Sequence, residues 1–191
     1  MTTYVALLRG INVGTKQRVP MRTLRDLLSG LGCGSVRTHL NSGNAVFTHP
    51  GSDPDALAAG LEEAIGRELG LSVRCFVREG VNLRRVVDAN PFADRAIDPA
   101  RFLVVFLSGP SSSSGAARPD TFADLDPGAY APDEFALGER EVYLICPDGI
   151  RDSKLAKLMT GRRLGEDGTA RNWNTVTRLA DMADETTEAD G

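Results

Sequence analysis

The spacing of apolar residues predicts an alternation of strands and helices over the first part of the chain. Short apolar runs predict strands at 4–8, 36–40, 45–48 and 72–77. Apolar residues at helical spacing predict a helix from Pro20 to Gly32 and a second over 53–69. The resulting order, β-α-β-β-α-β, is that of a ferredoxin-like unit.

The rest of the chain repeats most of this order. Strands are expected at 101–107, 134–137 and 142–146, and helices at 83–89, 121–125 and 153–164, with Ser153 as the N-cap of the last. The stretch TARNWNTVTRLADM, residues 169–182, predicts a helix in the place of the last strand. We therefore expect an α+β fold of two ferredoxin-like halves, in a pattern that suggests internal duplication.

These elements define the expected domain organisation. The first half covers 1–79, and the second covers 80–183 and includes the C-terminal helix. Residues 184–191 are polar and acidic, which predicts a disordered tail. The serine-rich segment 108–120 predicts a flexible loop.

The central strands are apolar at successive positions, as in YVALL, FLVVFL and VYLIC. A strand of this kind is covered on both faces. A sheet that stacks RNA bases needs an exposed face with aromatic residues. The pattern therefore disfavours an RNA-recognition motif.

Composition and charge narrow the classes of function. The chain has 191 residues, of which 41% are hydrophobic and 25% charged, and no apolar run long enough for a membrane span. The N-terminus lacks a signal sequence, so we expect a cytoplasmic protein with no membrane partner. The net charge of −4 disfavours a general nucleic-acid binder. However, 9–26 carries five basic residues and one acid, and 151–178 carries seven basic residues and three acids. Such asymmetry favours an anion-binding face, although solvated surface charges are the alternative.

The residues typical of catalytic and metal sites are sparse. Cys33, Cys75 and Cys146 lie far apart and predict buried free thiols rather than a metal site. The two histidines follow no ligand-like pattern, and Ser42 has no evident histidine partner. We therefore predict no metal and no cofactor. The catalytic residues, if any, are not identified, and whether the protein is an enzyme stays open.

Two loops are candidates for anion binding. Residues 9–16, RGINVGTK, leave the first strand, and their glycines allow backbone N–H groups to surround an anion. Residues 41–44, NSGN, form the expected hairpin turn. In an antiparallel sheet of this order the turn lies at the same end as the exit of the first strand. The two loops should therefore be neighbours.

The stretch 169–182 contains the only tryptophan. On a helical wheel Trp173 and Val176 lie on an apolar side, whereas Arg171, Asn174 and Thr175 lie on a polar side. We expect the indole to anchor the helix and the polar residues to face outward. Thr169 or Asn172 can cap the helix, whose N-terminus favours an anion. A plain docking helix, or stacking of the indole on a base, are the alternatives.

Several segments together resemble one protein family. They are ALLRGINVG (6–14), the helix start near 21–25, LNSGNAVF (40–47), NPF (90–92), VVFL (104–107) and TARNWNTV (169–176). In this order they resemble the domain-of-unknown-function family 1697. The resemblance covers nearly the whole chain apart from the tail. It implies a two-part α+β protein of bacterial origin and supplies no catalytic residue. Thr15, where members often have a second glycine, and the serines at 111–114 depart from the family pattern.

These observations lead to one leading hypothesis and two alternatives. The leading hypothesis is a polar cleft between the two halves that binds an anionic, phosphate-bearing small molecule, a nucleotide or a nucleic acid. The expected ligand-binding residues are Arg9, Asn12, Gly14, Lys16, Ser42, Asn44, Arg171, Asn172, Asn174 and Thr175. The first alternative is a structural or protein-interaction module whose polar motifs lock the halves together. The second is an enzyme that acts on a phosphorylated small molecule. The oligomeric state is not predicted.

Overall fold

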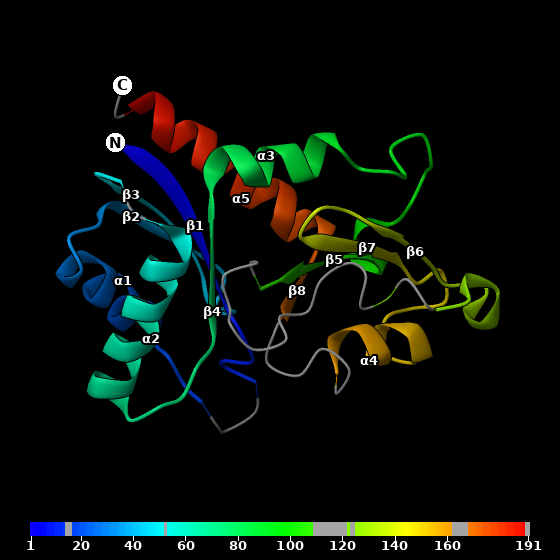
Figure 1. Ribbon diagram of the computed structural model, residues 1–191, viewed down its shortest axis with the longest axis horizontal. Coiled ribbons are helices and arrows are strands. Elements are labelled where there is room, and N and C mark those ends of the chain that lie inside the picture. Colours follow the sequence, from blue (N-terminus) through cyan, green and yellow to red (C-terminus); the bar gives the residue numbers. More distant parts are fainter. Residues whose placement is uncertain (14–16, 52, 109–121, 123–124, 162–167, 190–191) are drawn as a thin grey trace. The chain divides into compact units, whose positions relative to one another are not determined.

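The computed structural model describes residues 1–13, 17–51, 53–108, 122, 125–161 and 168–189. It is an α+β fold with two four-stranded antiparallel sheets (Figure 1). The chain divides into two compact units, Met1–Arg85 with Arg178–Gly191, and Val86–Thr177. The first boundary therefore lies within helix α3 (Gly80–Asp88) rather than at residue 79, and the second lies within helix α5 (Trp173–Ala189).

The first sheet has the strands and helices that the apolar pattern predicts. Its strands are β1 (Thr2–Leu8), β2 (Gly34–His39), β3 (Asn44–His49) and β4 (Cys75–Glu79), in the order β2-β3-β1-β4. Helix α1 (Met21–Gly30) joins β1 to β2, and α2 (Pro54–Leu69) joins β3 to β4. Asp53 caps α2 through the N–H of Asp55. The strand expected at 72–77 begins three residues later, at Cys75.

Helices α1 and α2 cover one face of this sheet (Figure 1). Alternate residues of β1, such as Tyr4, Ala6 and Leu8, pack into this core together with Leu24 and Leu61 of the helices. The intervening residues of the strand are buried as well. The expectation that the central strands are covered on both faces is thus confirmed for β1.

The second sheet repeats the strand order of the first. Its strands are β5 (Phe102–Leu107), β6 (Glu134–Leu137), β7 (Glu141–Ile145) and β8 (Gly168–Asn172), in the order β6-β7-β5-β8. Short 3-10 turns span Pro99–Arg101 and Pro127–Tyr130. Helix α4 (Lys154–Thr160) packs on one face, where its Leu155 meets Leu103 and Val105 of β5. The Oγ of Ser153 accepts a hydrogen bond from the N–H of Ala156 at 2.7 Å, which confirms the predicted N-cap. Of the helix expected at 121–125, only residues 122 and 125 lie within the described part of the chain.

The prediction that a helix replaces the last strand of the second half is wrong. Residues 168–172 form β8, which pairs antiparallel with β5, and the helix begins only at Trp173. The physical reason is that β5 is buried and needs a hydrogen-bonding partner along each edge. β7 pairs with one edge, and the backbone of 168–172 pairs with the other, whatever its side chains.

The prediction of a disordered acidic tail is also wrong for residues 184–189, because α5 continues to Ala189. Residues 190 and 191 lie outside the described residues. Three acidic residues of α5 are paired with arginines elsewhere in the same unit. Asp184 and Asp181 lie 2.6 and 2.7 Å from Arg84 of α3, and Glu185 lies 3.0 Å from Arg37 of β2. The hydroxyl groups of Thr187 and Thr3 are 2.8 Å apart. The composition of this segment predicts disorder because the residues that stabilise the helix, Arg37, Arg84 and Thr3, lie far away in the sequence.

The two units share a detail beyond their strand order. Arg78 of β4 is paired in register with Val5, and Arg171 of β8 with Val104. Both arginine side chains are buried, and each donates to the carbonyl of the residue before it, at 2.9 and 2.8 Å. Equivalent residues in equivalent strands support the internal duplication that the sequence suggested.

The three cysteines are free and buried, as predicted. Burial raises the pKa of each thiol above its ordinary value.

We therefore expect no reaction of the native protein with a thiol reagent such as Ellman's reagent at pH 8, and reaction of all three thiols in guanidinium chloride. Rapid labelling of any cysteine in the native protein would show that its part of the core opens more readily than the packing implies.

Candidate functional site

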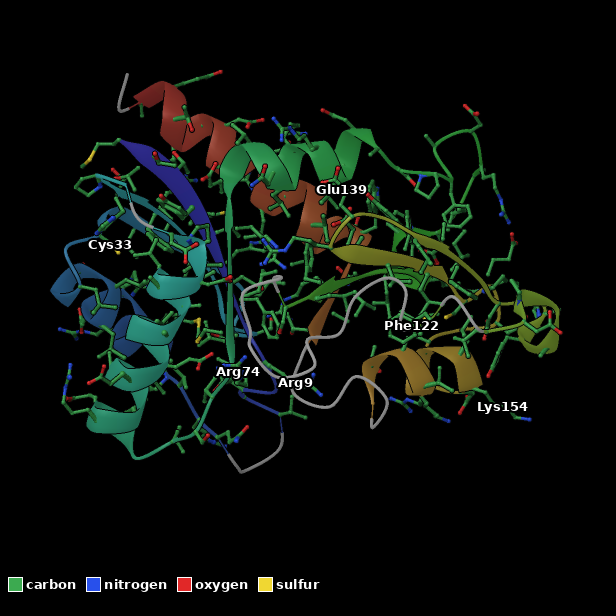
Figure 2. The ribbon with its side chains drawn as sticks, in the orientation of Figure 1. Arg9, Cys33, Arg74, Phe122, Glu139 and Lys154 are labelled. Carbon is green, nitrogen blue, oxygen red and sulfur yellow. The ribbon has the colours of Figure 1, made fainter. Side chains whose placement is uncertain are left out.

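The loop after β1 is held to its own sheet by backbone bonds. The N–H of Arg9 donates to the carbonyl of Arg74 at 2.9 Å, and Figure 2 shows these two residues at the same end of the first sheet. The N–H of Asn12 donates to the carbonyl of Gln17 at 3.0 Å and closes the loop across residues 13–16. Backbone hydrogen bonds therefore fix the positions of Arg9, Asn12 and Gln17 in this loop.

The side chain of Asn12 joins this loop to the hairpin turn. Its Nδ2 donates to the carbonyl of Asn41 at 2.6 Å and to that of Val19 at 2.9 Å. Its Oδ1 accepts from the N–H of Val19 at 3.0 Å. The N–H of Leu8 also donates to the carbonyl of Gly43, at 2.8 Å. The expectation that the two loops are neighbours is confirmed.

The hairpin turn has its own amide lock. Asn44 is fully buried, and its Nδ2 donates to the carbonyl of His39 at 3.0 Å and to the Oγ of Ser42 at 2.9 Å. Asn12 and Asn44, both expected to hold a ligand, therefore use these side-chain contacts to fix the backbone. This commitment leaves backbone groups and basic side chains as the means of binding at this end of the sheet.

Left-handed backbone is concentrated in the same two loops. Among the described residues, four that are not glycine have positive φ, and three of them are Asn12, Gln17 and Leu40, with φ of 57°, 53° and 56°. The fourth, Ser35, lies at the irregularity in the pairing of β2 with β3. Asparagine tolerates this conformation, but for Gln17 and Leu40 it costs roughly 1–2 kcal/mol, and a branched side chain such as leucine is rarely found there.

Basic residues flank the loop. Arg9 is half-buried and Arg18 is exposed. Gly14 and Lys16, both expected to bind the ligand, lie outside the described residues. His39 adds no positive charge at neutral pH, since burial and the nearby Arg178 lower its pKa from the ordinary value. Among the described residues of the two loops, the positive charge therefore comes from Arg9 and Arg18.

The other expected ligand-binding residues lie in the unit Val86–Thr177 and take different positions from those predicted. Arg171 is buried on a strand instead of facing outward from a helix, and its Nη1 donates to the Oγ1 of Thr169 at 2.9 Å. Burial lowers the pKa of Arg171 to about 10, so the guanidinium stays charged at neutral pH. Thr175, also expected to face outward, is buried.

Helix α5 begins as predicted in two respects. The Oδ1 of Asn172 accepts from the N–H of Thr175 at 3.0 Å, which makes Asn172 the N-cap. The ring of Trp173 stacks on Phe102 of β5, with centroids 4.6 Å apart and planes 12° apart. The indole therefore anchors the helix to its sheet, and stacking on a base is not its observed role. Asn174 is exposed.

The structure thus separates the predicted residues into two groups. Arg9, Asn12, Ser42 and Asn44 come together at one end of the first sheet. Arg171, Asn172, Asn174 and Thr175 surround the start of α5 in the other unit. A single cleft that contains both groups stays a prediction. The site residues expected from the sequence did not include Gln17, Arg18 or Leu40. For Leu40 the reason is that no sequence pattern predicts a left-handed leucine.

The second unit also contains a surface pocket of about 570 Å³, lined by residues that include Ile97, Ile145 and Pro147. Arg95 at its rim forms two bonds of 2.8 Å to the carboxylate of Glu134. This arginine is therefore already paired with an acid. The described residues contain no group of three or more histidine, cysteine or acidic side chains that could hold a metal ion. In the same residues no helix is both long and apolar enough to cross a membrane.

Comparison with known proteins identifies the family. The model of the family described as a protein of unknown function, DUF1697, matches residues 1–143. The chain belongs to this family. The match includes both loops of the candidate site and ends before β8, so the resemblance of residues 169–176 to the family lies beyond the matched part.

The solved structure of the conserved bacterial protein SP0830 from Streptococcus pneumoniae is similar to this chain. Its TM-score is 0.75 at 23% sequence identity, over 95% of this chain and 98% of the other, so the likeness concerns the fold. Two curated relatives, both called chloroplastic homologues of the translation factor GUF1 and both from Oryza sativa, indica and japonica, are 35% identical over 60 residues. This stretch is 29% of the present chain and only 9% of either translation factor.

The first prediction concerns Gly43 in the hairpin turn. Its φ is +75°, and a Cβ there would lie 2.7 Å from Leu8 and from Ile11. We expect Gly43→Ala to lower the free energy of unfolding by at least about 2 kcal/mol, from backbone strain and steric overlap together. Gly30→Ala is the matched control, because Gly30 lies in α1 with nothing within 4 Å of its added Cβ. Denaturant unfolding measures both, and equal stabilities would contradict the described turn.

The second prediction concerns the cap of α5. Asn172→Ala removes the acceptor for the N–H of Thr175 and should lower the free energy of unfolding by about 1 kcal/mol. Asn174→Ala, two residues further and exposed, should change it by less than about 0.5 kcal/mol. The reverse ranking in thermal or chemical denaturation would mean that Asn174, rather than Asn172, fixes the helix start.

Proposed function

We propose that the protein binds an anionic, phosphate-bearing ligand at the loop pair of the first unit, defined as residues 9–19 and 39–44. Arg9, Arg18 and Lys16 supply positive charge, and backbone N–H groups of the loop, including that of Gly14, meet phosphate oxygens. Asn12, Ser42 and Asn44 hold the two loops in place. In this proposal the asparagines act by positioning the backbone.

One observation carries the proposal, namely the left-handed residues that gather in this loop pair. Backbone strain of this kind persists only where the surrounding structure imposes it, and it is concentrated at functional sites. Here Asn12 imposes it through bonds to Val19 and Asn41. The described residues of the loop pair are therefore held in place before a ligand arrives, which reduces the entropy lost on binding.

The charge of the loop pair indicates an anion rather than a neutral or cationic ligand. Arg9 and Arg18 flank the loop, and the hairpin segment His39–Asn44 contains no acidic residue. A hydrogen bond between a guanidinium and a phosphate oxygen contributes about 1.5–3 kcal/mol.

Isothermal titration calorimetry with phosphate-bearing compounds tests the proposal. We expect Arg9→Ala and Lys16→Ala each to weaken the binding of ATP about tenfold or more, because each removes one charge-assisted contact. Arg85→Ala is the control, since Arg85 is an exposed arginine of α3, which follows the opposite end of the sheet. The same affinity in all three variants and the wild-type protein would remove the proposal.

A structural role is the second candidate, and a specific observation favours it. Asn12, Asn44 and Asn172 all use their amides to hold backbone within their own units. If this is their whole function, Asn12→Ala lowers the melting temperature and phosphate-bearing ligands do not raise that of the wild-type protein. A rise of the wild-type melting temperature with ATP concentration would decide against it.

The same strand order in both sheets supports a finer description of the fold. We propose that each unit is a ferredoxin-like domain and that the chain arose by duplication of one such domain. The order β2-β3-β1-β4 recurs as β6-β7-β5-β8, and the buried arginines Arg78 and Arg171 take equivalent positions.

A further inference from the structure

Two exposed apolar side chains lie within the loop pair. Val13 is 75% exposed and Leu40 is 60% exposed. Each is next in sequence to one partner of the hydrogen bond between Asn12 and the carbonyl of Asn41. They are therefore near each other at the surface, beside the residues to which the proposed function assigns phosphate binding.

The stability of the fold does not account for Leu40. Its side chain is mostly in water, so it contributes little apolar burial, and its φ of 56° is unfavourable for a branched residue. Asparagine or glycine at this position would relieve the strain. An exposed, strained leucine next to the hydrogen bond between Asn12 and Asn41 is instead what a contact for a ligand requires.

Val13 and Leu40 offer a surface that differs from that of the arginines nearby. Branched aliphatic groups bind the face of a flat ring by removing apolar surface from water. Arg9 and Arg18, close by in the same loop, are suited to phosphate. The loop pair therefore presents an apolar contact next to a cationic one, and a ligand that matches both has a planar ring joined to a phosphate.

We infer that the ligand is a nucleotide unit, with its base against Val13 and Leu40 and its phosphates toward Arg9. This inference rests on the proposed function and specifies the class of ligand. A free nucleotide and a single-stranded nucleic acid both present this chemistry. The net charge of −4 favours the free nucleotide.

Calorimetry with three probes tests the inference: ATP, inorganic tripolyphosphate and a short single-stranded oligothymidylate. We expect ATP to bind the wild-type protein at least about fivefold more tightly than tripolyphosphate. Tripolyphosphate carries at least as much charge, so any advantage of ATP comes from its nucleoside. Tighter binding of the oligothymidylate than of ATP would overturn the assignment to a free nucleotide.

The variants Leu40→Asn and Val13→Asn isolate the apolar contact. Each should weaken ATP to the level of tripolyphosphate and leave tripolyphosphate unchanged. The melting temperature of Leu40→Asn should equal or exceed that of the wild-type protein, because asparagine tolerates left-handed backbone. Val81→Asn, which changes an exposed valine of α3 beyond the other end of the sheet, should leave both affinities unchanged.

The outcomes separate the two proposals. If ATP and tripolyphosphate bind equally, or if Leu40→Asn keeps the full advantage of ATP, the base contact is wrong and phosphate binding stands. If neither compound binds the wild-type protein, the proposed function fails and the base contact fails with it. Loss of tripolyphosphate binding in Leu40→Asn would also overturn the inference, because it would place Leu40 in the phosphate contact.

Discussion

Each sheet depends on a central strand that is buried and must find hydrogen-bonding partners along both edges. β1 pairs with β3 and β4, and β5 pairs with β7 and β8. Because a buried backbone group without a partner costs as much as a lost hydrogen bond, the chain supplies a strand at both edges of each central strand. For this reason the polar residues 168–172 form the strand β8, and Arg171 on that strand is buried.

Backbone groups of the polar loops also need hydrogen-bonding partners. The side-chain amides of Asn12 and Asn44 donate to the backbone carbonyl groups of Val19, Asn41 and His39. Their amides fix a backbone that includes three left-handed residues other than glycine. A loop pair whose described residues are held by these bonds, with arginines at its border and two exposed apolar side chains, is the feature from which binding of a nucleotide is inferred.

Long-range charge pairing explains the C-terminal helix. Residues 184–189 have the composition of a disordered segment, yet Asp184 and Glu185 meet Arg84 and Arg37 within the first unit. Exposed ion pairs contribute little individually, at about 0–1 kcal/mol each. They act together with the burial of Met182, Ala183 and Thr186 on the same helix.

The sequence by itself determined the strands from β1 to β7, the helices α1 to α4, the cap at Ser153, the buried thiols and the adjacency of the two loops, and it limited the cap of the last helix to Thr169 or Asn172. These follow from local spacing and from the geometry of an antiparallel sheet. Only the tertiary structure decided that residues 168–172 form a strand, that α5 extends to Ala189 and that Leu40 is left-handed. Each of these depends on partners distant in the sequence: the open edge of β5, the arginines of the first unit, and the amide of Asn12 that holds the hairpin turn.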